Sequence, residues 1–277
     1  MTRVRRIELR LVGLPLVRPF RTSFGIATRK ECVVVRVETD AAEGWGECVA
    51  DIEPDFSSEW NQSAWSAIQT FLGPPCSTSR RCRRSRCTMS SGFVRGNPMA
   101  KATLVNAVLD AELRRRGESL ASYLGAARES VVCGVSVGIT ETVDELRAQV
   151  DAYLADGYRR IELKIAPGVD LDRVAAIRAD HPDVLLSVDA NAAYTLDDLD
   201  VFRALDDLGL LMIEQPLHHE DLVQHAKLQA RDPHGSVPGR VDPVGGRRGR
   251  RPRARRLPHR QRQAGARRRR ARGARGP

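Results

Sequence analysis

The spacing of hydrophobic positions changes character about halfway along the chain. In the first part, apolar positions predict strands over Arg5–Val17 and Glu31–Glu38, and the motif Gly44-Trp45-Gly46-Glu47 marks the start of another strand. A helical period follows over Met99–Arg115 and stops at Gly117. We therefore expect residues 1–125 to form a small α+β domain.

From Cys133 onward, short apolar runs alternate with amphipathic segments of helical length. The predicted strands are Cys133–Ile139, Arg160–Ile165, Val184–Asp189 and Leu210–Ile213. The predicted helices are Val143–Leu154, Leu171–Ala179, Leu196–Leu208 and Asp221–Gln229. Strands that are apolar on both faces and alternate with helices indicate a parallel sheet covered by helices. Four such units over residues 131–231 fit either a doubly wound sheet or part of a (β/α) barrel.

Three ionisable residues decide between these two folds. Lys164, Asp189 and Glu214 lie at the ends of successive predicted strands, and each is 25 residues from the next. In a barrel these strand ends form the rim on which catalytic side chains converge. No Gly-x-Gly-x-x-Gly motif follows the first strand, which disfavours a dinucleotide-binding sheet. The pattern favours a TIM-type barrel of the α/β class.

The same three residues suggest a chemistry. Two carboxylates on one rim are suited to a hard divalent cation, Mg²⁺ or Mn²⁺, and the adjacent lysine could remove a proton next to a bound carboxylate. Asn191 and Gln215 could support the site from behind. Any one of the three alone would be better explained as a strand-end cap or a solvated side chain. Three at one repeat interval favour the functional interpretation.

Composition adds a contrast between segments. The net charge of the 277-residue chain is +10, but residues 231–277 hold 17 Arg, no Lys and two acids, a net charge of +15. Residues 76–92 add five Arg and no acid, so the remainder carries −10. No apolar run is long enough to span a bilayer, and Met1–Leu14 lacks the apolar stretch of a signal peptide, so we expect a cytoplasmic protein.

Several motifs resemble those of the enolase superfamily, in particular its o-succinylbenzoate synthase / N-succinylamino acid racemase branch. They are Pro19–Gly25, Gly44–Cys48, Pro98–Ala102, Val135–Ile139, Glu162–Gly168, Ser187–Asn191 and Ile213–Leu217. The resemblance covers about residues 4–73 and 94–231. Such sites use a Lys or His base together with Mg²⁺.

The resemblance implies an α+β capping domain on a TIM-type barrel, with Mg²⁺ held by three acids on consecutive strands and two lysines facing each other across a small carboxylate substrate. Asp189 and Glu214 then match the first two acids, and Lys164 matches one lysine. Substrate-binding residues are expected at Phe20, Ser23 and Ser136, and a family-like homo-oligomer is compatible with the resemblance. One departure is Glu162, which stands where the family usually has the first lysine of a Lys-x-Lys pair.

The third acid and the second lysine should lie near residues 239 and 263, which are Gly239 and Gln263. The arginine-rich region 232–277 cannot supply the four remaining βα units of a barrel, so we expect a truncated barrel with a disordered tail and interpret the tail as the product of a shifted reading frame. We translated this region from the second base of each codon and left the third base of every codon unconstrained. The codons of Ser236–Asp242 can then encode Pro-Cys-Leu-Asp-Glu-Ser-Ile, in which the Asp arises from codon 239. In the same frame His259–Ala266 can become Ile-Val-Asn-Val-Lys-Pro-Gly-Arg, with its Lys at codon 263. A short compensated shift over residues 76–92 is a weaker hypothesis.

Three functional classes follow from these observations. The first is a Mg²⁺-dependent lyase that dehydrates a cyclohexadiene carboxylate to 2-succinylbenzoate, a step of menaquinone synthesis, or a racemase of N-acylamino acids on the same scaffold. In either case we expect activity to be impaired by the missing acid and lysine. The second is an arginine-rich nucleic-acid-binding protein, which is disfavoured because the tail lacks interleaved aromatic residues. The third is a non-functional product with unpaired strand edges.

Overall fold

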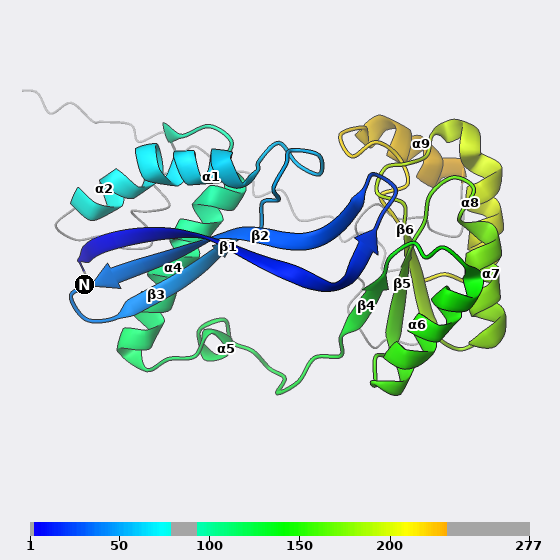
Figure 1. Ribbon diagram of the computed structural model, residues 1–277, viewed down its shortest axis with the longest axis horizontal. Helices are drawn as coiled ribbons and strands as arrows, with labels where there is room; N and C mark the ends of the chain where they lie inside the picture. The colour runs from blue at the N-terminus through cyan, green and yellow to red at the C-terminus, as the bar shows by residue number, and fades with distance from the viewer. Residues whose placement is uncertain (1–2, 79–92, 232–277) are drawn as a thin grey trace, which may run out of the picture. The chain divides into compact units, whose positions relative to one another are not determined.

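A computed structural model describes residues 3–78 and 93–231 of the chain (Figure 1). Two sheets organise these residues. The first is antiparallel with the order β1-β2-β3, built from β1 (Val4–Arg21), β2 (Ile26–Thr39) and β3 (Glu43–Cys48). The second is parallel with the order β4-β5-β6-β7.

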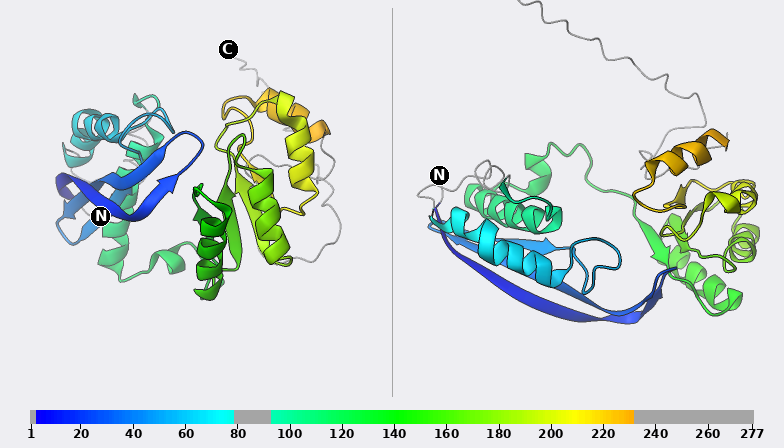
Figure 2. Two further views of the ribbon diagram at one scale, coloured as in Figure 1. Left: turned by 45° about the vertical axis from the view of Figure 1, so that its right-hand side comes forward. Right: turned by 90° about the horizontal axis from the view of Figure 1, so that it is seen from above.

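The first sheet buries one face beneath helices. Val33, Val35 and Val37 alternate along β2 and are fully buried, as a period of two predicts for a sheet covered on one side. They form a core with helices α1 (Asn61–Ala67) and α4 (Pro98–Arg116). Figure 2 shows both helices on the same side of this sheet. The π-helical turn η1 (Ile68–Leu72) and helix α2 (Gly73–Thr78) continue from α1, and the short helix α5 (Leu120–Tyr123) follows α4.

Strand β3 lies unusually close to α4 because its inward positions are glycines. A Cβ atom added at Gly44 would lie 2.1 Å from the Ala107 carbonyl oxygen, and one added at Gly46 would lie 2.2 Å from that of Thr103. Both distances are far shorter than an ordinary contact, so only glycine permits this approach. The helix itself ends at Gly117, whose positive φ of 64° turns the chain out of the helix.

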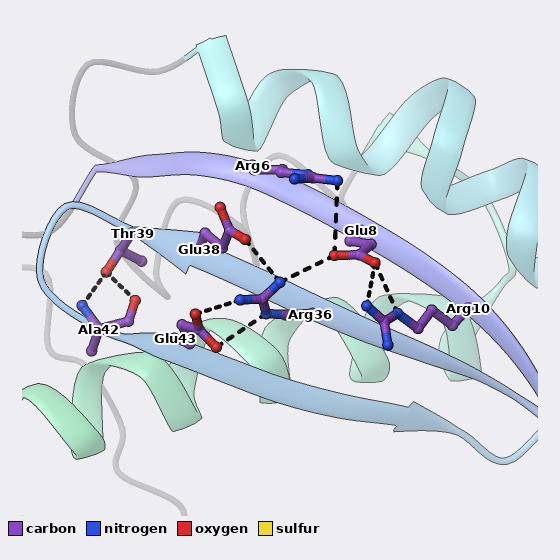
Figure 3. Close-up of polar contacts among 8 residues, drawn as sticks. All are labelled: Arg6, Glu8, Arg10, Arg36, Glu38, Thr39, Ala42 and Glu43. Atoms are coloured by element: carbon purple, nitrogen blue, oxygen red, sulfur yellow. Dashed lines mark hydrogen bonds and ion pairs between the residues drawn. The ribbon is translucent and has the colours of Figure 1, made fainter.

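The opposite face of the first sheet carries ion pairs (Figure 3). The Arg36 guanidinium on β2 bonds to Glu43 on β3, with 3.0 Å from Nε to Oε2, and to Glu8 on β1, with 3.3 Å from Nη1 to Oε2. The hydrogen bond from Arg36 is the main cause of a lowered pKa at Glu43. At the next turn, the Thr39 hydroxyl accepts a hydrogen bond from the Ala42 amide at 2.9 Å and donates to its carbonyl. These contacts tie the three strands together.

The second sheet comes from four consecutive βα units. Its strands are β4 (Gly134–Val137), β5 (Arg160–Lys164), β6 (Leu185–Asp189) and β7 (Ile213–Glu214). Its helices are α6 (Val143–Ala155), α7 (Leu171–Asp180), η3 (Leu196–Asp198) with α8 (Leu199–Asp206), and α9 (Leu222–Arg231). Helices α6, α7 and α8 cover one side of the sheet (Figure 1) and form a second core with its apolar face.

Local sequence fixes where these helices begin. Thr142 caps α6 by accepting a hydrogen bond from the Glu145 amide at 3.1 Å, and Glu145 closes a reciprocal capping box. Asp170 caps α7 and also accepts a hydrogen bond from the buried Tyr194 hydroxyl at 2.8 Å. The start of α7 is thereby tied to the segment that follows β6.

The expected fold class is confirmed: an antiparallel α+β part precedes parallel βα units. Details differ. Strands β1 and β2 extend beyond Val17 and before Glu31, so the motif Pro19–Gly25 is the end of a long hairpin, closed by Thr22–Gly25. The helices over residues 61–78 were not predicted, and β7 is shorter than Leu210–Ile213. Within the described residues, no helix is long and apolar enough to cross a membrane.

Candidate active site

One row of the parallel sheet brings the three predicted residues together. Lys164 on β5 pairs in register with Asp189 on β6, which pairs in register with Glu214 on β7. All three are the last residues of their strands, at the carboxyl edge of the sheet. Their equal spacing in sequence therefore corresponds to direct adjacency in space.

The Lys164 ammonium lies between two carboxylates. Its Nζ atom is 2.5 Å from Asp189 Oδ2 and 3.4 Å from Glu162 Oε1. The side chains of Lys164 and Asp189 are only 11% and 6% exposed, so water screens this pair little. At this degree of burial, each of the two charges interacts strongly with the other charged groups around it.

Glu162 is fixed from the neighbouring strand. It lies one row below Lys164, in register with Ser136 on β4 and Ser187 on β6. The Ser136 hydroxyl donates a hydrogen bond to Glu162 Oε1 at 2.8 Å. Ser136, expected to bind substrate, therefore holds the carboxylate that faces Lys164.

Glu214 lies where ionisation is disfavoured. Burial raises its pKa above the ordinary value, and the nearby negative charges of Asp189 and Glu162 raise it further. The positive charges of Lys164 and Arg160 act in the opposite direction. Asp189 and Glu162 together with Glu214 form a local excess of negative charge.

Asn191 and Gln215 stand directly behind this row. The Asn191 backbone amide donates to Asp189 Oδ1 at 2.8 Å, and its side-chain amide donates to Asp189 Oδ2 at 2.9 Å. The same side-chain amide lies 3.4 Å from Gln215 Oε1. Both residues, which were expected to support the site, orient Asp189 or one another.

The backbone behind the row is strained. Asn191, Ala192 and Gln215 have positive φ angles of 45°, 64° and 42°, a region that costs a side-chain-bearing residue of order 1–3 kcal/mol. The strain is held by a hydrogen bond from the Ala192 amide to the Gln215 carbonyl at 2.7 Å. Strained backbone immediately after two strand-end carboxylates is typical of functional sites. Sequence reasoning missed this feature, since none of the three residues is glycine.

The tip of the β1–β2 hairpin reaches the same strand ends. The Ser23 hydroxyl donates to the Ala190 carbonyl at 3.0 Å, next to Asp189. The Ile139 amide, just past β4, donates to the Arg21 carbonyl at 2.8 Å. Phe20 lies against Gly138, where an added Cβ would be 3.3 Å from its ring. Two of the three expected substrate-binding residues are thus placed at the edge of the site.

Arg160 is a further charged residue that sequence reasoning did not single out. It shares a strand face with Glu162 and Lys164, since the three alternate along β5 while Ile161 and Leu163 are buried against the helices. Its charge acts on Glu214. The period of two within Arg160–Lys164 was the signal that could have revealed it.

The donor set is compatible with part of a site for a hard divalent cation. Within residues 3–78 and 93–231, no group of three or more His, Cys, Asp or Glu side chains is arranged to hold a metal ion. Asp189 and Glu214 nevertheless offer hard oxygen donors side by side, and the buried Asn191 Oδ1 atom has no hydrogen-bond partner among the residues that the structure describes. The positions expected for a third acid and a second lysine, Gly239 and Gln263, lie outside the described residues, as does most of 76–92.

The antiparallel α+β part, followed by parallel βα units with a lysine–carboxylate row at the strand ends, has the arrangement of a capping domain and part of a (β/α) barrel. The chain belongs to the enolase superfamily. Residues 6–125 match the mandelate racemase / muconate lactonizing enzyme N-terminal domain, and residues 145–238 match the enolase C-terminal domain-like family.

More specific similarities come from individual relatives. The chain is 48% identical over 226 residues to an N-succinylamino acid racemase from Amycolatopsis sp, which covers 81% of this chain and 61% of the relative. It is 43% identical over 224 residues to an o-succinylbenzoate synthase from Geobacillus stearothermophilus, covering 80% and 60%. A solved enolase superfamily member from Listeria innocua has a TM-score of 0.78 at 35% identity, covering 83% of this chain and 62% of that one. The chain spans about three fifths of the length of the curated relatives it matches.

Proposed function

We propose that this site serves the removal of a proton from the carbon next to a carboxylate, with Lys164 as the base. The observation that carries the proposal is the row Lys164–Asp189–Glu214, in register on three adjacent strands at the carboxyl edge of the sheet. A lysine beside two carboxylates suits this chemistry, since the base lies next to the groups that would hold a cation. Membership of the enolase superfamily supports the same reaction class.

Each residue has a distinct role in this proposal. Asp189 and Glu214 would hold Mg²⁺, or Mn²⁺ in its place, and Asn191 orients Asp189 through two hydrogen bonds. The cation would supply positive charge that stabilises the enediolate left when the proton is removed. Phe20 and Ser23, from the hairpin tip, would contact the substrate and exclude water above the strand ends.

The leading reaction is the syn-dehydration of a cyclohexadiene carboxylate to 2-succinylbenzoate, a step of menaquinone synthesis. Lys164 takes the proton next to the carboxylate and, as its ammonium, gives it to the departing hydroxyl group on the same face, so that one molecule of water is lost. The similarity to the Geobacillus synthase supports this reaction. It needs one base, and Lys164 fills that role.

A second candidate is the racemisation of N-succinylamino acids, favoured by the 48% identity to the Amycolatopsis racemase. Racemisation removes a proton from one face of the α-carbon and returns one to the other, so it needs a base on each face. Within the described residues, Lys164 is the one lysine on this row. Loss of a second lysine would therefore impair racemisation more than dehydration.

We further propose that the chain as it stands has little or no turnover, because the third acid and second lysine of such a site would be encoded in a shifted frame after codon 231. The fraction of each relative that is matched, about three fifths, supports this. The test compares the present chain with the product of the same gene read one base on after codon 231. Both proteins are assayed with the cyclohexadiene carboxylate and with an N-succinylamino acid, with and without Mg²⁺.

We expect Mg²⁺-dependent turnover by the restored chain and a loss of at least about a thousandfold in the present one. Dehydration faster than racemisation would identify a synthase, and the reverse would identify a racemase. Equal turnover by the two chains, or an early stop codon in the shifted frame, would refute the frame interpretation.

A further inference from the structure

Two charged residues of the site, Arg160 and Glu162, have no role in the proposed function, and Glu162 is the one that contacts Lys164. It stands two residues before Lys164 on β5, so both side chains project from the same face of the sheet. Its side chain is 22% exposed, and its Oε1 atom both accepts the Ser136 hydrogen bond and faces the Lys164 ammonium. A carboxylate fixed in this way by a neighbouring strand has a defined position and a defined partner.

Several groups bind the Asp189 carboxylate at the same time. Its Oδ2 atom contacts Lys164 at 2.5 Å and Asn191 at 2.9 Å, and its Oδ1 atom accepts the Asn191 backbone amide. A divalent cation that binds Asp189 would repel the Lys164 ammonium that contacts the same carboxylate, and this repulsion favours displacement of the ammonium. The displaced ammonium then needs another anionic partner within reach.

We propose that Glu162 is a positioning residue that retains the Lys164 side chain at the site when a divalent cation takes Asp189, until the ammonium gives up its proton and Lys164 can act as the base. This inference rests on the proposed function, since it assumes a cation site at Asp189. Glu162 already lies 3.4 Å from the Lys164 Nζ atom, so the exchange requires only a small movement of a flexible side chain. Ser136 keeps the accepting carboxylate in place.

Formal charges support this role. With all five groups ionised, Lys164, Arg160, Glu162, Asp189 and Glu214 sum to −1, so one divalent cation leaves the site at +1. Without the charge of Glu162 the loaded site would carry +2. Buried excess charge is costly, so Glu162 should strengthen cation binding through Lys164.

The test measures Mn²⁺ binding by electron paramagnetic resonance on the full chain and on Glu162→Gln, Lys164→Met and the double variant. We expect Glu162→Gln to weaken binding about tenfold and Lys164→Met to strengthen it. In the Lys164→Met background, Glu162→Gln should have at most about a twofold effect, since no ammonium remains to be held. The control is Glu129→Gln, which removes an exposed carboxylate and should leave binding unchanged.

Four results would overturn the inference. A full tenfold effect of Glu162→Gln in the Lys164→Met background would make Glu162 a direct cation ligand. An equal effect of Glu129→Gln would show that Glu162 influences binding only through the net charge of the protein. Absence of Mn²⁺ binding in every protein would refute the cation site of the proposed function, and the inference with it, whereas binding that ignores Glu162 refutes the inference alone.

A second readout observes Lys164 directly and does not depend on how the variants fold. The chain holds only four lysines, Lys30, Lys101, Lys164 and Lys227, so a protein labelled with ¹³C at lysine Cε gives four assignable signals. We expect Mg²⁺ to move the Lys164 signal with the midpoint of binding and to leave the other three in place. An unchanged Lys164 signal at saturating Mg²⁺ would contradict the exchange.

Discussion

Substitution of Gly46 by alanine tests how the antiparallel part is held together. The added Cβ would lie 2.2 Å from the Thr103 carbonyl oxygen and 3.1 Å from the Ala107 amide nitrogen, both backbone atoms of α4. An ordinary contact begins near 3.4 Å, so β3 or α4 would have to move by about 1 Å. Backbone of a helix cannot rotate out of the way as a flexible side chain can. We therefore expect a loss near the upper end of overpacking costs, about 3 kcal/mol.

The assay is urea unfolding followed by tryptophan fluorescence. All three tryptophans, Trp45, Trp60 and Trp65, lie in this part of the chain, so the signal reports its unfolding. The matched control is Gly25→Ala at the hairpin turn, where an added Cβ meets nothing within 4 Å, and it should change the unfolding free energy by less than about 1 kcal/mol. Equal unfolding midpoints for the two variants would refute the packing argument.

Three further substitutions test individual polar side chains. Glu59 is buried and accepts hydrogen bonds from the Met99 and Ala100 amides at the start of α4, so Glu59→Gln should cost about 1–2 kcal/mol in urea unfolding. The Arg178 guanidinium donates to five backbone carbonyls around the ends of α7 and α8, and Arg178→Lys, which cannot span them, should lower the melting temperature. Because burial raises the pKa of Glu214, the folded state binds its proton more tightly than the unfolded state, and its contribution to stability falls as pH rises above 4.5. Glu214→Gln should therefore gain stability relative to the parent between pH 5 and pH 7 in urea titrations, and an unchanged difference would contradict this.

The row of site residues could be predicted from sequence because it follows from topology alone. One βα unit of constant length separates Lys164, Asp189 and Glu214, and parallel strands in register then place them side by side. The partners of these residues could not be predicted in this way. Ser136 reaches Glu162 from another strand, and its hydrogen bond depends on side-chain rotamers that no spacing encodes.

The antiparallel part was harder to predict than the parallel units. Residues 61–78 form helices whose sequence mixes aromatic, small and proline residues and includes a π-helical turn, so no single period marks them. The hairpin of β1 and β2 continues to Arg21 and Ile26, past Pro15 and Pro19, because a register shift between Pro15 and Phe20 accommodates the prolines. Sequence alone therefore predicted the row of ionisable residues better than the hairpin that lies beside it.

The central claim is that Lys164 removes the substrate proton beside a cation held by Asp189 and Glu214. Its most direct test is the turnover of the cyclohexadiene carboxylate by the restored chain and by its Lys164→Ala variant, each saturated with Mg²⁺ and each checked for an unchanged fold by circular dichroism. Loss of a general base is expected to reduce turnover by about a hundredfold to ten-thousandfold. Turnover of the variant within a few-fold of the parent would show that another group takes the proton.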